Sequence, residues 1–441
     1  MSKNSHTNKS AQNEPSQPVS DRADLSLLRF LSCGSVDDGK STLIGRMLYD
    51  SKSLLVDQVD GLKTLGRNED DEDLEFNLAN VTDGLRAERV QGITIDVAYR
   101  FFSTAKRKFI VADTPGHVQY TRNMVTGAST AEVALILVDA RKGIQEQTRR
   151  HSYISTLLGI RKIVLCVNKM DLVDYSQDNF DEIVAEYGEF IKRKHLPDVN
   201  VWAIPVCALK GDNVVSKSSS MDWYQGPPLL ELLENLPLEG RREGDARFVV
   251  QCVVRPQGGD YRDFRGFAGL VTSGVMKVGD PVTVLPSGVS SKIKSILLYP
   301  DYLGQAICGQ SVTIELEQDV DVSRGDTISG KGNLPEVSNE LKAMLCWFGE
   351  TPLKVGKKYA LQHTGHSCRA IIKELCYAVD VTSLDSIQAE SLNVNEIGLA
   401  MVKTSKEIIC EPYVKNRNLG SFILIDEVSN ETVGAGMIQG L

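Results

Sequence analysis

The stretch GSVDDGKST at residues 34–42 constrains this chain more than any other. It follows the apolar run LLRFLSC and fits G-x-x-x-x-G-K-S/T, a pattern that joins a buried strand to a helix. Its two glycines let the backbone curl so that N–H groups point at phosphate oxygens, while the lysine reaches the β- and γ-phosphates. We therefore predict nucleotide binding by Gly34, Ser35, Val36, Asp37, Asp38, Gly39, Lys40, Ser41 and Thr42, with Lys40 also stabilising charge during reaction and Ser41 binding Mg²⁺.

Two acids in this loop are unexpected, because Asp37 and Asp38 stand beside a polyanion. We expect both carboxylates on the outer side of the loop, with the backbone N–H groups turned inward. Nothing in the sequence explains why acids are used there.

The motif DTPGH at 113–117 follows the apolar run KFIVA. An aspartate at a strand end beside a phosphate loop commonly anchors Mg²⁺, often through water, so Asp113 is a second predicted metal ligand. Gly116 permits close backbone approach, and its N–H can contact the γ-phosphate. The imidazole of His117 can orient an attacking water, although a single histidine is more often structural. The predicted contacts are Asp113, Thr114, Pro115, Gly116 and His117.

Two further motifs are typical of a guanine site. In NKMD at 168–171, the carboxylate of Asp171 can accept hydrogen bonds from guanine N1–H and the 2-amino group, which adenine does not offer in that arrangement. In CALKGDNV at 207–214, the amides of Ala208 and Leu209 can contact the guanine O6. Either motif alone is also compatible with a polar strand-to-loop turn. The predicted contacts are Asn168, Lys169, Met170, Asp171, Cys207, Ala208 and Leu209, with Asn168 and Lys169 bracing the loop.

The segment GITID at 92–96 completes the set, although alone it is also typical of a β-branched strand start. Thr94 can give its hydroxyl to Mg²⁺ and its N–H to the γ-phosphate, and a segment held only by these contacts is released on hydrolysis. Together the motifs predict a GTPase with a conformational output, in which water attacks the γ-phosphorus in line. The predicted catalytic residues are His117, Lys40 and Thr94.

The remaining sequence predicts three folded domains. The apolar runs ALILVDA (134–140) and KIVLCVN (162–168) have the length of strands, and we expect helices around 118–127, 145–159 and 177–194. Strands that alternate with helices over residues 26–240 predict an α/β P-loop GTPase domain with a mostly parallel sheet and helices on both faces. Short alternating strands between turn residues then predict two all-β barrel domains, at 241–332 and 333–441. Residues 1–25 are rich in Ser, Asn and Gln, and we expect a disordered tail.

Composition narrows the possible partners. A formal net charge of −9 disfavours a broad nucleic-acid surface. The nine cysteines form no C-x-x-C pair, which is typical of reduced thiols in a cytoplasmic protein. The N-terminus has no signal-peptide core, and no apolar run approaches the roughly 18 residues needed to cross a bilayer. We expect a cytoplasmic protein that binds neither nucleic acid nor membranes.

The order GSVDDGKST, GITID, DTPGH, NKMD and two β-rich domains resembles the translation-factor superclass of GTPases, as in elongation factor Tu. The chain is more similar to the large, GTP-hydrolysing subunit of bacterial sulfate adenylyltransferase, over about 27–441. GSVDDGKSTLIGRMLYDSK, NLANVTDGLRAERVQGITIDVAYRFF, FIVADTPGHVQYTRNMVTGAST, DFRGFAGLVTSG and DVSRGD carry that similarity. Tu-like factors usually have His where this chain has Asp37 or Asp38. Val90 and Cys207 depart from the family's usual residues without affecting predicted nucleotide contacts.

This resemblance implies GTP and Mg²⁺ as cofactors and a smaller catalytic ATP sulfurylase subunit as partner. That subunit would make adenosine 5′-phosphosulfate and pyrophosphate from ATP and sulfate, with GTP hydrolysis here driving the uphill reaction. Some relatives carry a fused kinase, which we expect to be absent because no second phosphate loop is present: Thr351 stands where the leading Gly before KVGKK should be. Two alternatives remain: a translation-type factor that delivers charged tRNA, and a regulatory GTPase with an unrelated partner.

Overall fold

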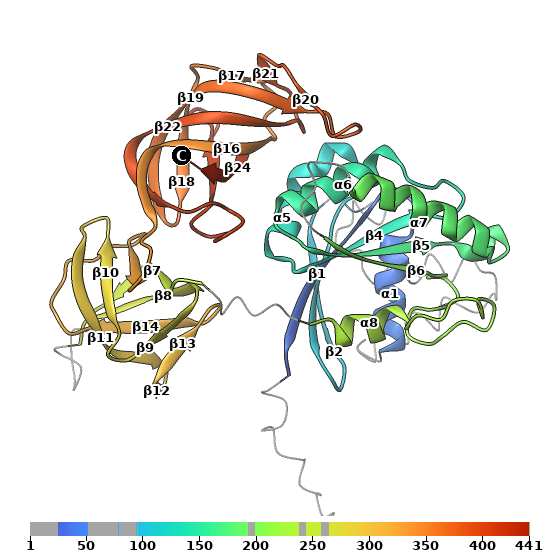
Figure 1. The fold of residues 1–441 in the computed structure, drawn as a ribbon, viewed down its shortest axis with the longest axis horizontal. Coiled ribbons are helices and arrows are strands. Elements are labelled where there is room, and N and C mark those ends of the chain that lie inside the picture. The colour runs from blue at the N-terminus through green and yellow to red at the C-terminus, as the bar shows by residue number, and fades with distance from the viewer. Residues whose placement is uncertain are drawn as a thin grey trace, which may run out of the picture.

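The computed structural model describes residues 25–51, 78, 94, 96–192, 199–237, 244–256 and 264–440. The chain opens with a six-stranded sheet in the order β2-β3-β1-β4-β5-β6 (Figure 1). All pairs in it are parallel except the β2–β3 hairpin, which is antiparallel. The strands are β1 (Leu27–Gly34), β2 (Ala98–Ser103), β3 (Lys108–Asp113), β4 (Val133–Asp139), β5 (Lys162–Asn168) and β6 (Asn200–Pro205).

Helices cover both faces of this sheet. Helices α5, α6 and α7 share one hydrophobic cluster with it, and α1 and α8 share another. Strands β4 and β5 are buried along their whole length, which explains their continuous apolar sequences. The helical elements are α1 (Lys40–Asp50), η2 (Val118–Tyr120), α5 (Thr121–Thr130), α6 (Glu146–Leu157), η3 (Met170–Val173), α7 (Gln177–Ile191) and α8 (Leu229–Asn235), where η marks a 3₁₀ turn.

Two antiparallel barrels follow. Pairing of β10 with β11 closes the ring β10-β15-β7-β8-β14-β11, and β12 extends it. Closure leaves these six strands without a free edge. The strands of this part are β7 (Arg247–Val254), β8 (Gly266–Ser273), β9 (Val275–Lys277), β10 (Pro281–Leu285), β11 (Val289–Leu298), β12 (Asp301–Leu303), β13 (Gln305–Ile307), β14 (Ser311–Leu316) and β15 (Thr327–Gly330).

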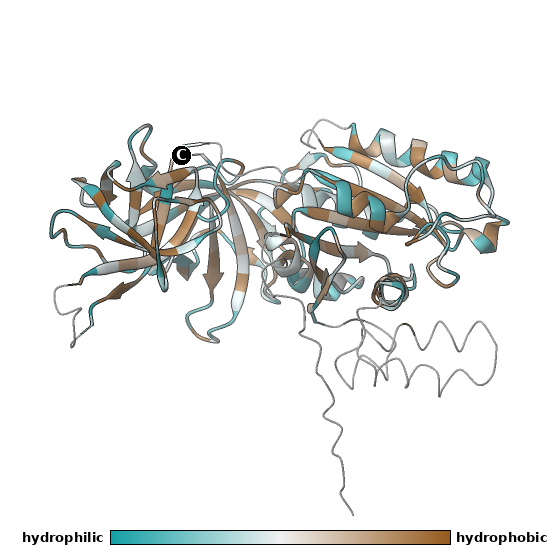
Figure 2. Ribbon diagram, turned by 90° about the horizontal axis from the view of Figure 1, so that it is seen from below, coloured by the Kyte–Doolittle hydropathy of each residue, from teal (hydrophilic) through white to brown (hydrophobic). Residues whose placement is uncertain are grey.

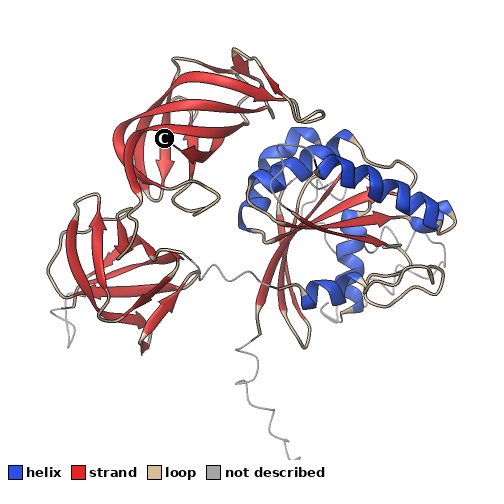
Figure 3. Cartoon of the chain, viewed as in Figure 1, coloured by secondary structure: helices blue, strands red, loops and turns tan. Residues whose placement is uncertain are grey.

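The second barrel closes in the same way, through pairing of β18 with β19 around the ring β18-β23-β24-β16-β22-β19. Figure 3 shows strands and loops, without helices, in the described parts of both barrels. The strands are β16 (Glu336–Trp347), β17 (Leu353–Lys354), β18 (Lys358–His363), β19 (His366–Val379), β20 (Ser386–Ile387), β21 (Ser391–Leu392), β22 (Ile397–Cys410), β23 (Ser421–Ile425) and β24 (Thr432–Gly440).

Specific contacts join these parts. The guanidinium of Arg247, fully buried in the first barrel, lies 3.0 Å from the carboxylate of Glu411 in the second. Arg417 of the second barrel donates to the carbonyls of Ala131 (3.0 Å) and Gly159 (2.6 Å), which follow α5 and α6. Apolar residues of the second barrel also join the cluster on the α5–α6 face, and Figure 2 shows the brown, apolar strands of the three parts.

The predicted fold class is therefore confirmed: a P-loop α/β domain with a mostly parallel sheet precedes two all-β barrels. The domain boundaries at 240/241 and 332/333 remain predictions. Residues 238–243, around the first boundary, lie outside the described residues, as do residues 1–24 of the predicted tail. Among the described helices, none is long and apolar enough to cross a bilayer.

Candidate nucleotide-binding site

The predicted loops meet at one edge of the sheet. Strands β1, β3, β5 and β6 run in parallel, and their carboxyl ends lead into residues 34–42, 113–117, 168–171 and 207–209. In open parallel sheets ligands bind at this edge. Hydrogen bonds thereby join the phosphate loop, NKMD and the start of CALKGDNV, although these motifs are spread over 176 positions from 34 to 209.

The phosphate loop has a shape that requires its glycines. At Gly34, with φ +154°, an added Cβ would lie 2.6 Å from the carbonyl oxygen of Leu137. At Gly39, with φ +89°, an added Cβ would lie 2.4 Å from Nδ2 of Asn168. Any side chain there would therefore clash and strain the backbone as well.

Lys40 is buried at the centre of the loop. Its Nζ donates to the carbonyl oxygens of Gly34 (3.1 Å) and Ser35 (2.8 Å). Burial lowers the pKa of Lys40, and the carboxylates of Asp113 and Asp38 oppose that shift. The two acids therefore help to keep a charged ammonium group at the place where phosphates are expected.

The prediction that both loop acids face outward is correct for Asp37 and wrong for Asp38. Asp37 is exposed, with a left-handed φ of +66°, but the side chain of Asp38 is only 1% exposed. Its Oδ2 accepts the N–H of Ser35 at 2.6 Å, so Asp38 braces the loop from within. Burial raises the pKa of Asp38, and Lys40 opposes this. A carboxylate is a strong acceptor for a loop amide, which suits an acid to this position.

The DTPGH segment lies directly against the phosphate loop. Asp113 is 1% exposed and its Oδ1 accepts the hydroxyl of Ser32 at 2.8 Å, while the hydroxyl of Thr114 donates to the Ser32 carbonyl at 2.6 Å. A Cβ on Gly116 would lie 2.6 Å from both the Gly34 carbonyl and Nζ of Lys40. The geometry therefore requires glycine at the position expected to approach the γ-phosphate.

His117 and the GITID segment are less constrained. The imidazole of His117 is exposed, and its Nδ1 accepts the N–H of Gln119 at 3.3 Å. Of GITID, residues 92, 93 and 95 lie outside the described residues, as does Val90, and Thr94 is half-buried. The roles of His117 and Thr94 remain predictions.

Asn168 ties the guanine motifs to the phosphate loop. Its Nδ2 donates to the carbonyl of Asp38 at 2.8 Å, and its Oδ1 accepts the N–H of Ala208 at 2.9 Å. The N–H of Ala208 is thus already used for bracing, whereas we expected it to meet the base. Met170 is fully buried in the core beneath the motif.

The side chains around the expected base position are polar. Nζ of Lys210 lies 3.6 Å from the carboxylate of Asp171, whose side chain is 12% exposed. Burial raises the pKa of Cys207 to about 12, so its thiol stays neutral. Cys207 also bonds through its backbone to Asp212 at 3.1 Å.

Three supporting residues were missed by sequence reasoning. Arg46 on α1 donates to the carbonyls of Ala208 (3.2 Å) and Leu209, and Nε2 of Gln147 on α6 donates to the Gly116 carbonyl at 3.1 Å. Fully buried Asp139 accepts the Arg141 side chain at 2.7 Å and lies 3.5 Å from Lys169. Its position at the end of an apolar strand is a signal that could have indicated it.

The predicted metal ligands fit Mg²⁺ chemically. The hydroxyls of Ser41 and Thr94 and the carboxylate of Asp113 are hard oxygen donors, and the bond from Ser32 orients that carboxylate. Mg²⁺ usually combines a few protein oxygens with waters and substrate phosphates.

Comparison with known proteins gives the family. Residues 26–238 match the elongation factor Tu GTP binding domain, and residues 340–439 match a GTP-eEF1A C-terminal domain-like model. Sulfate adenylyltransferase subunit 1 of Aliivibrio fischeri is 49% identical over 417 residues, covering 94% of this chain and 86% of the relative. The protein of that name from Vibrio cholerae is 50% identical over 416 residues, with the same coverage.

Among solved structures, sup35 complexed with GDP is similar at 21% identity and a TM-score of 0.43, covering 98% of each chain. Identity of about one half to the two relatives extends over nearly the whole chain and includes the barrels. This chain therefore belongs to the sulfate adenylyltransferase subunit 1 family, with an elongation factor Tu-type GTP-binding domain at its N-terminal end.

Proposed function

We propose that this chain is the GTP-hydrolysing subunit of a sulfate adenylyltransferase. The observation that carries the proposal is the Asn168 bridge, which assembles a phosphate loop and two guanine motifs in a chain whose relatives bear that enzyme's name. Hydrolysis is coupled to the formation of adenosine 5′-phosphosulfate and pyrophosphate from ATP and sulfate. That chemistry takes place on a smaller catalytic ATP sulfurylase subunit, in a cytoplasmic hetero-oligomer.

In this proposal the chain's own residues bind, orient and polarise GTP. The carboxylate of Asp171 accepts the guanine N–H groups, and the loop amides with Lys40 hold the β- and γ-phosphates. Ser41, Thr94 and Asp113 hold Mg²⁺, which neutralises phosphate charge.

His117 orients a water whose oxygen bonds to the γ-phosphorus as the bond to the bridging oxygen breaks. The products are GDP and phosphate. His117 is exposed and directly follows Gly116, whose backbone lies against the phosphate loop, which supports this role.

The test measures whether GTP hydrolysis depends on the partner subunit and its substrates. GTP hydrolysis by the purified chain is measured alone and after addition of the small subunit, ATP and sulfate, with omission of sulfate and a Lys40→Ala chain as controls. We expect a rise only with the complete mixture. A rate unchanged by the small subunit and its substrates would contradict the proposal.

The elongation factor Tu-type domain leaves tRNA delivery as the second candidate. Retention of charged tRNA on a filter at physiological salt, dependent on GTP, would favour it. We expect no retention, because the net charge of −9 opposes binding to phosphate backbones.

A further inference from the structure

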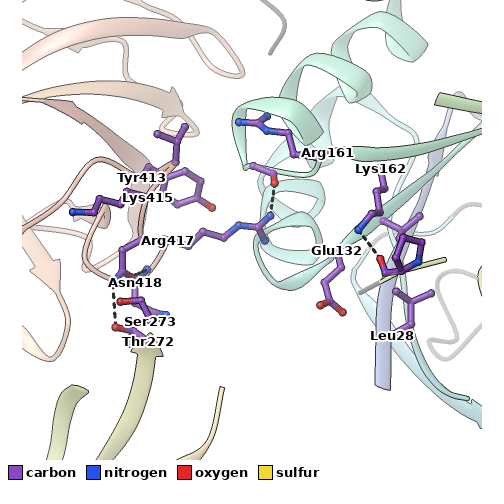
Figure 4. A pocket seen from close by; sticks show the side chains of 15 residues that line it. Leu28, Glu132, Arg161, Lys162, Thr272, Ser273, Tyr413, Lys415, Arg417 and Asn418 are labelled. Carbon is purple, nitrogen blue, oxygen red and sulfur yellow. Dashed lines mark hydrogen bonds between the residues drawn. The ribbon is translucent and has the colours of Figure 1, made fainter. Parts of the chain in front are cut away.

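A cavity of about 320 Å³ lies at the edge of the first sheet where its parallel strands begin (Figure 4). The nucleotide loops lie at the other edge, where these strands end. The walls of the cavity include Leu28 near the start of β1, Val133 at the start of β4 and Lys162 at the start of β5. The seven residues of β5 separate its two ends by about 20 Å. The cavity is therefore distinct from the candidate GTP site.

Three parts of the molecule build this cavity, which we call the junction cavity. Beside the strand starts of the first sheet, it is lined by Thr272 and Ser273 from β8 of the first barrel and by residues 413–418 after β22 of the second. Ligand sites occur preferentially at such domain interfaces, and a volume near 300 Å³ suits a small molecule. A ligand filling it would touch all three parts.

The junction cavity is strongly basic in a chain that is acidic overall. Among its lining residues that the structure describes, Arg161, Lys162, Lys415 and Arg417 are cationic, and Glu132 is the acid. Oε2 of Glu132 accepts the N–H of Arg29 at 3.1 Å, so this carboxylate is engaged with the backbone. The lining therefore carries a formal charge of +3, four cations less one acid, against −9 for the whole chain. Outside the lining, the carboxylates of Glu411 (3.3 Å) and Asp245 (3.7 Å) pair with Nζ of Lys415, so Arg161, Lys162 and Arg417 contribute most of its positive charge.

Hydrogen bonds to backbone carbonyls hold two of these cationic side chains in place. Nη2 of Arg417 donates to the Gly159 carbonyl at 2.6 Å, and Nζ of Lys162 donates to the Pro237 carbonyl at 2.7 Å. Gly159, with φ +77°, allows this approach, because a Cβ there would lie 3.1 Å from Nε of Arg417. Cationic groups held in place in this way cost a ligand less ordering entropy than flexible ones.

From the positive charge, the fixed positions of the cations and the volume, we propose that the junction cavity binds a small ligand carrying a phosphate or sulfate group. Guanidinium groups match tetrahedral oxyanions with paired N–H donors, and ammonium groups add charge. Because the walls come from three parts, the ligand stabilises the arrangement of the domains seen here. Its affinity is then linked to any domain movement that accompanies GTP hydrolysis.

The experiment uses the full chain with its nucleotide site saturated by GDP and Mg²⁺. Inorganic phosphate, inorganic sulfate and AMP are titrated by calorimetry at low ionic strength, where surface charge is least screened. We expect saturable binding of at least one probe. Tighter binding of AMP identifies a phosphate ester as the ligand, and equal binding identifies the free oxyanion.

Variants localise the binding. Arg161→Gln should weaken it about tenfold or more, the usual effect of losing a charged hydrogen bond. Lys415→Gln removes a cation of the same lining and should weaken binding severalfold, although it also breaks the ion pair with buried Glu411. Lys358→Gln, an exposed lysine on β18, is the matched control and should change nothing.

Three results would overturn the proposal. These are the absence of saturable binding for all three probes, binding seen only when GDP is left out, and equal affinity in Arg161→Gln, Lys415→Gln and the Lys358→Gln control. Because Lys415→Gln also removes ion pairs with Glu411 and Asp245, Tm is measured for every variant, and Arg161→Gln against Lys358→Gln decides the question if Lys415→Gln is destabilised.

Discussion

Replacing Asn168 by alanine should detach the phosphate loop from the guanine motifs. The side chain is 2% exposed and bridges the Asp38 carbonyl (2.8 Å) and the Ala208 N–H (2.9 Å). Each buried group that loses its partner costs about 1–3 kcal/mol, so the two together cost about 2–6 kcal/mol. Relaxation of the loops reduces this to about 2–4 kcal/mol, a loss of GDP affinity of roughly 30- to 1000-fold.

The assay is the Kd of a fluorescent GDP analogue, together with Tm. Asn416→Ala is the matched control: Asn416 is 3% exposed, donates to the Thr272 hydroxyl at 3.1 Å and accepts the Asn418 N–H at 3.1 Å, far from the nucleotide loops. We expect both variants to lose stability but only Asn168→Ala to lose GDP affinity. If Asn168→Ala bound GDP within about threefold of the parent, the bridging argument would be refuted.

Four further outcomes are expected. Asp171→Asn should shift preference from guanine to xanthine nucleotides in competition binding, and retained guanine preference would refute its assignment. His117→Ala should bind GTP normally but lower partner-stimulated hydrolysis by about 10² or more; a parental rate removes His117 from the mechanism. Burial lowers the pKa of His151 to about 3, so the unfolded chain takes up a proton below about pH 6.5 that the folded chain refuses. Stability should therefore fall by about 1.4 kcal/mol per unit from pH 6.5 towards 3, and His151→Gln, compared by urea unfolding at two pH values, should fall less. Gly159→Ala should lower Tm more than Gly143→Ala: both have positive φ, but only the Cβ at 159 meets a guanidinium nitrogen, at 3.1 Å, while that at 143 meets nothing within 4 Å.

Elements whose constraints are local could be predicted from the amino-acid order alone. A phosphate loop needs Gly34, Gly39 and Lys40 at fixed spacing, because backbone curvature and the reach of one side chain decide its shape. The continuous apolar runs of β4 and β5 are likewise typical of buried parallel strands. The turn-rich alternation of short strands after residue 241 predicts barrels. The predicted ends of helices differ from the observed ends by a few residues. The helix expected at about 118–127 is α5, Thr121–Thr130, because the 3₁₀ turn η2 occupies Val118–Tyr120.

Which of these residues contact one another depends on the three-dimensional packing and could not be predicted from local patterns. From the sequence, Asp38 was expected to face solvent. In the structure it is buried, and its carboxylate accepts the N–H of Ser35. The partners of Asn168 lie 130 and 40 positions away, at distances along the chain that carry no pattern. The junction cavity is a further example, because its basic walls come from segments that no local motif connects. Such contacts depend on strand order and domain packing, which sum many weak interactions over the whole chain.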